Sequence, residues 1–166
     1  IQFMTVSGIQ SAMLRRVTAP PPAPLYERRE REGRLRDLAG LADNTRPQST
    51  IVPQNMTHDE MSDAYQALYT RLLGDAEIAR RIRNKVRYLR DPLYQSAFPL
   101  TERLRIFLRL IVKGILPGGI GRIAHFLGSL PIFAPSRMSL VVADWIIGLS
   151  MKEFAARKLA ADPFES

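Results

Sequence analysis

The chain has 166 residues, 46% of them hydrophobic and 24% charged, a composition typical of a globular protein that can bury one sizeable core. It contains no cysteine, which excludes disulfides, thiolate metal sites and an iron–sulfur cluster held by its own side chains. The 24 Lys and Arg residues outnumber the 16 Asp and Glu residues and leave a net charge of +8, which favours acidic partners, although arginine on solvated helix faces explains the same excess.

The first residues have the composition of a β-strand. Apolar and β-branched side chains fill most of the range 2–9. Between Ala19 and Pro24, closely spaced prolines exclude helix and central strand, because proline lacks an amide proton and fixes φ. We therefore expect a lone strand followed by a Pro-rich, extended spacer.

A short helix and a long polar loop follow. Residues 25–31 can form a helix that stops at Gly33, since glycine suits the left-handed position after a helix. The range 37–55 is polar, rich in turn-forming residues and without helical period, apart from a short extended piece around Ile51. Loops of this length in compact domains are usually functional or disordered.

Two capped helices predict a helical hairpin near the middle of the chain. Thr57 and Glu60 form a capping box for a helix that runs to Leu72, and residues 75–89 repeat apolar side chains at helical spacing. The rest of this second helix is crowded with Arg and Lys. Two interpretations of that basic face are open, namely contact with nucleic-acid phosphates and plain solvation.

Three further helices complete the pattern. A helix capped by Thr101 runs to Ile115, a short one covers 120–130, and a long one runs from Ser136 to about residue 160. Glycines 118, 119 and 121 suggest a phosphate-binding loop, but no strand precedes them, which favours a helix–helix corner. The last helix carries Asp144 within its apolar run and indicates a core helix rather than a membrane span.

These patterns predict a mainly α fold, a bundle of about five helices preceded by the lone strand, the Pro-rich spacer and the long polar loop. We expect three segments: 1–24, with the strand and spacer; 25–56, with the short helix and loop; and 57–166, the helical domain. We expect no metal or nucleophilic site, because His58 and His125 have neither converging ligands nor a partner base.

The order of several motifs between residues 24 and 69 resembles the order found in a known family. Residues 24–35 read Pro-Leu-Tyr-Glu-Arg and then Glu-Gly-Arg-Leu, and they precede Asn44-Thr45, Ile51-Val52-Pro53 and the helix from Met56 to Tyr69. This order resembles the segment that leaves the barrel in cobalamin-binding radical SAM proteins, which include Fe–S oxidoreductases of the hopanoid-methylase-like and oxidative-cyclase-like kinds. The resemblance covers residues 2–89 and implies that the chain is the C-terminal region of a larger enzyme, with the last barrel strand in 1–24.

The resemblance also implies roles for particular residues. Ile9 and Gln10 would line the S-adenosylmethionine pocket of the intact enzyme, or else belong to a plain barrel strand. Asp43, Asn44 and Thr45 would face the substrate or simply turn the chain. The intact protein would use a 4Fe-4S cluster, S-adenosylmethionine and cobalamin, whereas this chain would hold no cofactor and no catalytic residue.

The implied function is accessory. By itself inactive, the chain would cover the open end of the barrel or shape a substrate channel, with the upstream radical SAM and cobalamin-binding domains as its partners. A rival from another class is a stand-alone basic helical module that binds nucleic acid or an acidic protein. Under the first interpretation nucleic acid is not expected as a partner.

The helix from Leu104 to Ile115 predicts contact with a surface. Arg105, Arg109 and Lys113 flank its broad apolar face, which is the pattern of a helix that lies in the interface of an anionic membrane. Burial of the same face in the bundle is the alternative. We accordingly expect a cytoplasmic protein, with membrane contact at most peripheral.

Overall fold

The computed structural model describes residues 2–11, 19, 21–35, 49–89 and 98–161. Contacts divide the chain into two compact units, Ile1–Ala12 with Leu68–Ala160 and Met13–Ala67 with Ala161–Ser166. The mainly α fold predicted from the sequence is confirmed, and among the described residues β-structure is limited to one isolated bridge. The division into three segments stays a prediction.

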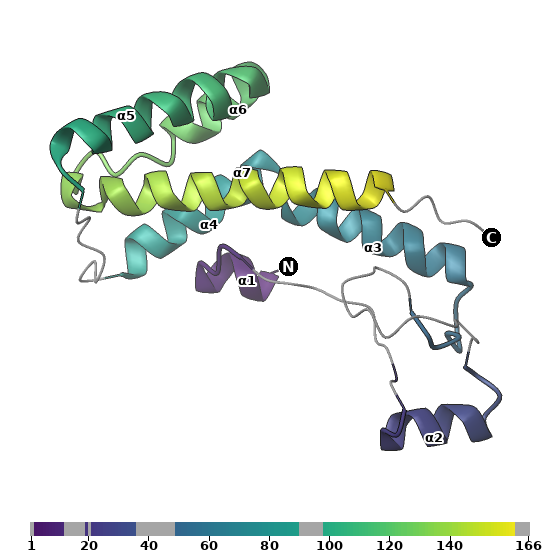
Figure 1. Ribbon diagram of the computed structural model, residues 1–166. Coiled ribbons are helices and arrows are strands. Elements are labelled where there is room, and N and C mark those ends of the chain that lie inside the picture. Colours follow the sequence, from purple (N-terminus) through teal and green to yellow (C-terminus); the bar gives the residue numbers. More distant parts are fainter. Residues whose placement is uncertain (1, 12–18, 20, 36–48, 90–97, 162–166) are drawn as a thin grey trace. The chain divides into compact units, whose positions relative to one another are not determined.

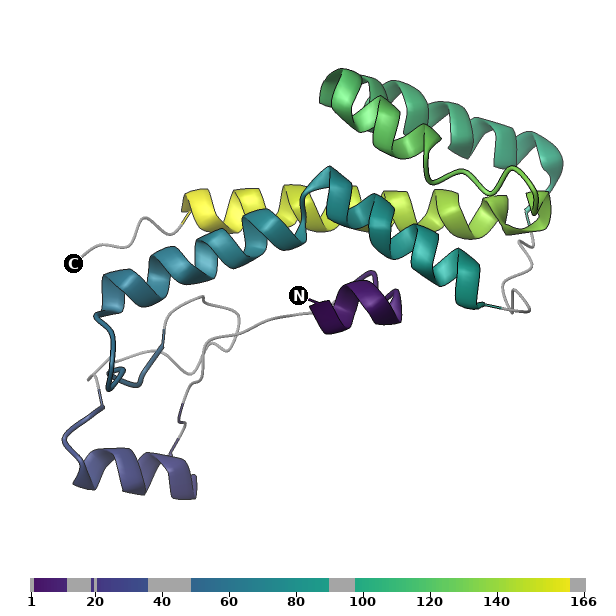
Figure 2. The same cartoon turned by 180° about the vertical axis from the view of Figure 1, so that it is seen from behind.

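The first unit is a bundle of helices. It contains α1 (Gln2–Ser7), α4 (Asp75–Tyr88), α5 (Leu100–Leu110), α6 (Gly119–Leu127) and α7 (Met138–Ala161). Figures 1 and 2 show the long helix α7 crossing α4, with the α5–α6 pair along one side of α7. Helix α6 also contacts α4 directly, through Arg122 and Asp75. A π turn (Ile111–Ile115) and a 3-10 turn (Leu116–Gly118) join α5 to α6, and a second 3-10 turn (Pro135–Arg137) leads into α7.

Trp145 of α7 lies at the centre of this unit and is fully buried. Its ring meets that of Phe126 edge-on, with centroids 5.7 Å apart. Its indole Nε1 donates to Ser129 Oγ at 2.9 Å, which satisfies the polar group that this large side chain takes into the core. The buried apolar residues clustered with Trp145 and Phe126 come from α4, α5, the π turn and α7: Ile78, Ala79, Ile82, Leu110, Ile115, Val141 and Val142.

Helices α4 and α7 approach each other closely at Gly148. A Cβ added to Gly148 would lie 2.9 Å from Ile78 Cγ2, so the contact requires glycine at this position. On α4, Ile78 and Ile82 are fully buried and Val86 packs against the core, which confirms the apolar face predicted from their spacing.

The long helix α7 is a core helix, as predicted. Asp144 lies within it and is 2% exposed. Within the ranges that the structure describes, no helix combines the length and the apolar character needed to cross a membrane.

The strand predicted over residues 2–9 is wrong, because the structure has the helix α1 there. An isolated strand leaves a row of unpaired backbone groups, whereas a helix pairs many of its own. Gly8 ends the helix at φ 69°. The amide of Gly8 donates to Thr5 O and that of Ile9 to Met4 O, the pair of hydrogen bonds that defines a Schellman motif.

Helix α1 packs on α4 through polar contacts. Thr5 Oγ1 donates to Glu77 Oε2 at 3.0 Å, and Asn84 Nδ2 donates to the Thr5 carbonyl at 2.8 Å. A Cβ added to Gly8 would lie 2.8 Å from Lys85 Cβ, so this glycine both turns the chain and lets it approach α4.

The second unit contains α2 (Pro24–Arg31) and the start of α3 (His58–Leu72). Gly33, at φ 65°, follows α2 in the left-handed conformation that the sequence predicted. Beyond it, Leu35 and Ile51 form the isolated antiparallel bridge.

The capping box at the start of α3 is confirmed. Glu60 N donates to Thr57 Oγ1 at 3.1 Å and Thr57 N donates to Glu60 Oε2 at 2.7 Å. The boundary between the two units falls at Leu68, inside α3. The packing of α3 and α4 as a hairpin therefore stays a prediction.

Candidate functional site

Helix α5 and the π and 3-10 turns after it carry apolar side chains on both their buried and their exposed faces. Pro99 rather than Thr101 occupies the N-cap position, and α5 begins at Leu100. Leu110 and Ile115 are buried, and Ile106, Phe107 and Ile111 pack against the core. Four others recur every four residues and stay exposed, at 59%, 53%, 59% and 52%: Leu104, Leu108, Val112 and Leu116.

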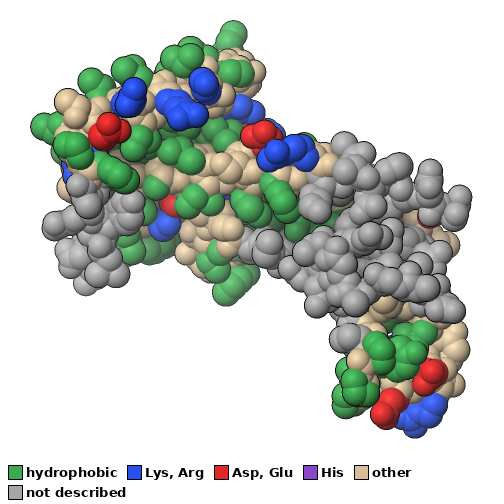
Figure 3. Space-filling model, viewed as in Figure 1, with side chains coloured by type: hydrophobic (Ala, Val, Ile, Leu, Met, Phe, Trp, Pro, Cys, Tyr) green, Lys and Arg blue, Asp and Glu red, His purple; other side chains and the backbone are tan. Residues whose placement is uncertain are grey.

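Three cations lie immediately beside these apolar residues. Arg105, Arg109 and Lys113 each follow one of them in the sequence, and all three are exposed. We call the seven residues the basic amphipathic strip. Figure 3 shows basic and apolar side chains intermingled over this part of the first unit. Such a surface can bury apolar groups in an interface while its cations remain at an anionic boundary.

The π turn, which carries Val112 and Lys113 of the strip, is held by hydrogen bonding to α6. Arg122 of α6 donates through Nη1 to the Gly114 carbonyl at 2.7 Å and through Nε to Asp75 Oδ2 at 3.1 Å. Lys152 of α7 donates to the other oxygen of Asp75 at 2.9 Å. Burial by itself raises the pKa of Asp75, but the hydrogen bonds from Lys152 and Arg122 outweigh it and hold that pKa below its ordinary value.

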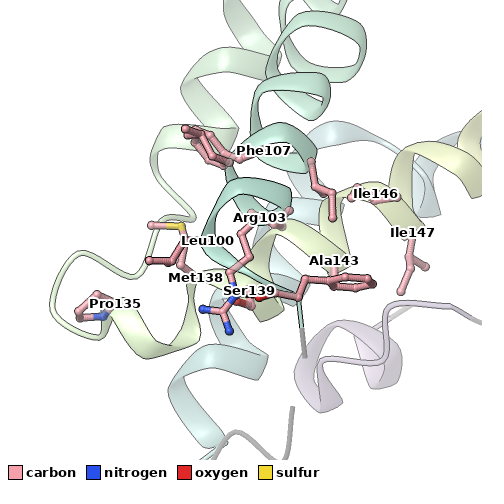
Figure 4. Close-up of a pocket in the computed structure, with 13 residues that line it drawn as sticks. Leu100, Arg103, Phe107, Pro135, Met138, Ser139, Ala143, Ile146 and Ile147 are labelled. Carbon is pink, nitrogen blue, oxygen red and sulfur yellow. Dashed lines mark hydrogen bonds between the residues drawn. The ribbon is translucent and has the colours of Figure 1, made fainter. Parts of the chain in front are cut away.

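A pocket of about 580 Å³ lies between α5, α7 and the segments that lead into them. Most of its walls are apolar (Figure 4). The side chains that line it are Phe98, Leu100, Arg103, Leu104, Ile106, Phe107, Pro135, Met138, Ser139, Val142, Ala143, Ile146 and Ile147. Leu104 belongs both to this pocket and to the strip, so the two features are adjacent on α5.

Arg103 is the one charged side chain among these pocket residues, and Ser139 supplies a hydroxyl from the facing helix. Arg103 Nε donates to the Phe98 carbonyl at 3.0 Å, which anchors the guanidinium beside the start of α5. Figure 4 shows Arg103 and Ser139 on the two helices that enclose the pocket. The arrangement pairs an apolar pocket with a small set of polar groups, as in many small-molecule sites.

Ile9 and Gln10, the two residues expected near S-adenosylmethionine, differ in their exposure to solvent. Ile9 is 38% exposed. Gln10 is buried, where Arg81 Nε donates to its Oε1 at 3.3 Å and its Nε2 donates to the Asp144 carbonyl at 3.2 Å. Protein groups of α4 and α7 therefore occupy both ends of the Gln10 amide.

Around Gln10 lies a buried cluster of charges. Arg81 is fully buried, and its Nη1 donates to the Leu72 carbonyl at 2.7 Å. Lys85 Nζ donates to Asp144 Oδ1 at 2.9 Å. Burial raises the pKa of Asp144, and the hydrogen bond and charge of Lys85 oppose that rise only in part; burial also lowers the pKa of Arg81.

The sequence interpretation of α4 missed this cluster. The sequence pattern predicts one solvated or nucleic-acid-binding face for its arginines and lysine, but Arg81 is buried and Lys85 is paired with Asp144. The sequence spacing does indicate this placement, because Arg81 and Lys85 follow Ile78 by three and seven residues and therefore lie on the same face of α4 as Ile78. The pocket gave no comparable signal, since residues 98–107 and 135–147 meet only through tertiary packing.

Three further predictions concern residues 43–45, the glycines around Gly119 and metal binding. Asp43, Asn44 and Thr45 lie outside the described residues. The glycines around Gly119 form the expected corner, with the 3-10 turn leading into α6. In the described part of the chain, no three His, Cys, Asp or Glu residues converge as a metal site would require.

Fold and site together define a mainly helical domain with an apolar pocket and a basic amphipathic surface. The chain belongs to the family described as a domain of unknown function, DUF4070, whose model matches residues 23–157. No curated protein and no solved structure matches the chain.

Proposed function

We propose that this chain is the accessory C-terminal domain of a radical SAM and cobalamin protein, and that it docks that protein onto an anionic membrane surface. The motif order within residues 24–69 and the match to a family associated with radical SAM and cobalamin proteins support the first part. The chain has no cysteine to ligate an iron–sulfur cluster, and the Gln10 amide is engaged by Arg81 and Asp144. These residues do not fit the cluster or S-adenosylmethionine, so the domain acts beside the catalytic centre.

The basic amphipathic strip is the observation that carries the membrane role. Transfer of an exposed leucine-sized side chain out of water stabilises a complex by about 1.5–3 kcal/mol when burial is complete. Each cation close to an anionic lipid surface contributes about 1 kcal/mol more. Four apolar residues and three cations on one strip are sufficient for reversible docking even if the insertion is shallow.

Nucleic-acid binding is the weaker interpretation, because much of the positive charge of α4 is buried or paired with acidic residues of the chain. Arg81 is buried, Lys85 is paired with Asp144, and Arg80 Nη2 lies 2.8 Å from Glu77 Oε1. Arg83 and Arg87 are the exposed cations that remain between residues 80 and 88. The apolar groups of the strip also have no role on a phosphate backbone, whereas a membrane accepts them.

Vesicle co-sedimentation tests the proposal. The purified chain should sediment with vesicles of phosphatidylglycerol and phosphatidylcholine at low salt, less at high salt, and little with phosphatidylcholine alone, because salt screens the attraction to headgroups. Arg105→Glu with Arg109→Glu should abolish sedimentation. Arg83→Glu with Arg87→Glu makes the same change in net charge on exposed sites of α4 and should leave most of it.

Several outcomes would contradict the membrane role. Wild-type chain that stays in the supernatant at low salt removes it. Equal losses in the two double variants would show that net charge, not the strip, drives the association. Tight binding of duplex DNA that survives the change at Arg105 and Arg109 would favour the rival function. The radical SAM part is tested separately, since the coding sequence upstream should contain Cys-x-x-x-Cys-x-x-Cys.

A further inference from the structure

The loop that joins α6 to α7 presents two large apolar side chains to solvent. Phe133 is 101% exposed and Ile132 is 77% exposed. From residue 128 to residue 136 the sequence has no charged side chain, and a proline lies on either side of the exposed segment. We call residues 128–134 the apolar loop. Neighbouring apolar residues exposed to this degree mark a surface that contacts a partner.

Both ends of the apolar loop are fixed to the bundle. At its start, the buried hydroxyl of Ser129 accepts a hydrogen bond from Trp145 Nε1 at 2.9 Å. Just beyond its end, Arg137 Nη1 donates to the carbonyl of Val86 on α4. The exposed side chains are therefore held in place before any partner arrives, which lowers the entropy cost of binding.

The backbone of the apolar loop pairs many of its own polar groups. The amide of Ile132 donates to the Leu130 carbonyl at 3.0 Å, and the amide of Ala134 donates to the Pro131 carbonyl at 2.9 Å. Pro131 has no amide proton to satisfy. Because a paired amide loses less when it leaves water, this backbone can approach an apolar medium at reduced cost.

The apolar loop adjoins the basic amphipathic strip beside the pocket between α5 and α7. Pro135, which follows the loop, and Leu104 of the strip both line that pocket. Leu100 lines it as well and is exposed, and Figure 4 shows Leu100 and Pro135 toward the same end of the pocket. Apolar side chains thus connect the strip to the loop.

The charge of this part of the chain has one sign. Between Glu102 and Asp144 the sequence contains five arginines and one lysine but no aspartate or glutamate. This segment includes the strip, α6 and the apolar loop. An anionic membrane complements both of its properties, because headgroups attract the cations and the acyl region accepts the apolar side chains.

We propose that Ile132 and Phe133 insert into the headgroup and acyl boundary of the anionic membrane on which the strip docks. The inference rests on the proposed membrane role and deepens it, because it assigns a second element of the chain to the same partner. The cations of the strip provide an attraction that salt screens. The apolar loop contributes burial of apolar surface, which depends on area rather than on charge.

Vesicle co-sedimentation of the full chain tests the contribution of the loop. Ile132→Ala with Phe133→Ala should weaken binding to vesicles of phosphatidylglycerol and phosphatidylcholine by about tenfold or more, since two large apolar side chains are lost. The factor should be similar at low and high salt. Phe3→Ala with Val6→Ala removes a similar pair of exposed side chains from α1 and should bind like the wild type.

A fluorescent label tests insertion directly. The chain has no cysteine, so one introduced thiol can be labelled selectively with nitrobenzoxadiazole. With Phe133→Cys, the emission of the label should rise and shift to the blue when the same vesicles are added, and lipid that carries a spin label on its acyl chain should quench it. With Val6→Cys on α1, the label should remain in water.

Each outcome bears on either the membrane role or the loop. Wild-type chain that does not sediment at low salt overturns both. Sedimentation of the wild type together with a label that stays in water at Phe133→Cys overturns the loop alone, as does a loop variant that binds like the α1 control. Circular dichroism and thermal unfolding check that each variant is folded, and if the double loop variant is not, the label decides.

Two other occupants of the loop are distinguished by the same variants. Analytical ultracentrifugation without vesicles should find a monomer. A dimer that Ile132→Ala with Phe133→Ala abolishes would assign the loop to a second copy of the chain and overturn the proposal. Equal binding of the wild type to phosphatidylcholine vesicles and to anionic ones would show that the loop acts without the cations, which contradicts a shared anionic partner.

Discussion

Lys85 Nζ lies 2.9 Å from Asp144 Oδ1 and thereby ties α4 to α7 within the buried polar cluster. Asp144 is 2% exposed, and its other oxygen, Oδ2, has no hydrogen-bond partner among the described residues. The ionised carboxylate is therefore only partly compensated, which agrees with the raised pKa of Asp144. Gln10, which follows α1, binds the main-chain carbonyl of the same Asp144.

Asp144→Asn should change the pH dependence of stability in a defined direction. Since the folded-state pKa of Asp144 is raised above its ordinary value of 3.8, its stabilising contribution is complete below that pH and is lost as pH rises through the folded pKa. The difference in the free energy of unfolding between variant and wild type should therefore move in favour of Asn as pH rises from 3 to 7. Urea denaturation at a series of pH values measures this, and a shift in favour of wild type would contradict it.

Asp75→Asn should show the opposite sign. Lys152 and Arg122 hold the folded-state pKa of Asp75 below 3.8, so its contribution is present above that pH and is lost as pH falls through the folded pKa. At neutral pH the variant should lose about 1–2 kcal/mol of the free energy of unfolding, because both partners are cations and Lys152 is partly solvated. The loss should shrink in acid. A loss that is independent of pH would show that the ion pairs are not its cause.

Ile82→Ala should destabilise the first unit more than Leu68→Ala does. Ile82 is fully buried, so the change should cost about 2–5 kcal/mol through lost burial and the cavity left behind. Leu68, on α3, is only half-buried and should cost less. Chemical denaturation of both variants provides the comparison, and equal losses would show that the two positions are equally enclosed.

Gly148→Ala and Gly121→Ala should have effects of opposite sign. Alanine normally stabilises a helix by about 0.5–1 kcal/mol relative to glycine, and Gly121 has no heavy atom within 4 Å of an added Cβ. At Gly148 the added Cβ meets Ile78 at 2.9 Å, and overpacking should cost about 1–3 kcal/mol. Thermal unfolding distinguishes the two, and stabilisation of both variants would mean that α4 and α7 can separate at no cost.

The sequence by itself determined those features that depend on neighbouring residues. The capping box of Thr57 and Glu60 and the glycine end at Gly33 are local, because their hydrogen bonds join groups a few residues apart. The buried face of α4 and the core position of α7 follow from the period of one helix, which exists before any packing. The apolar and basic pattern of the strip could also be predicted from the sequence, because it follows the period of a single helix.

Tertiary structure decided what depends on partners distant in the chain. Residues 2–9 have strand-like composition, but a strand needs a neighbouring backbone to pair with, and here α4 offers a helix surface on which α1 packs. Arg81 became buried because Gln10, Leu72 and the cluster at Asp144 surround it. The pocket exists only because α5 and α7 leave a space between side chains far apart in the sequence, and no periodicity within a single helix encodes such a space.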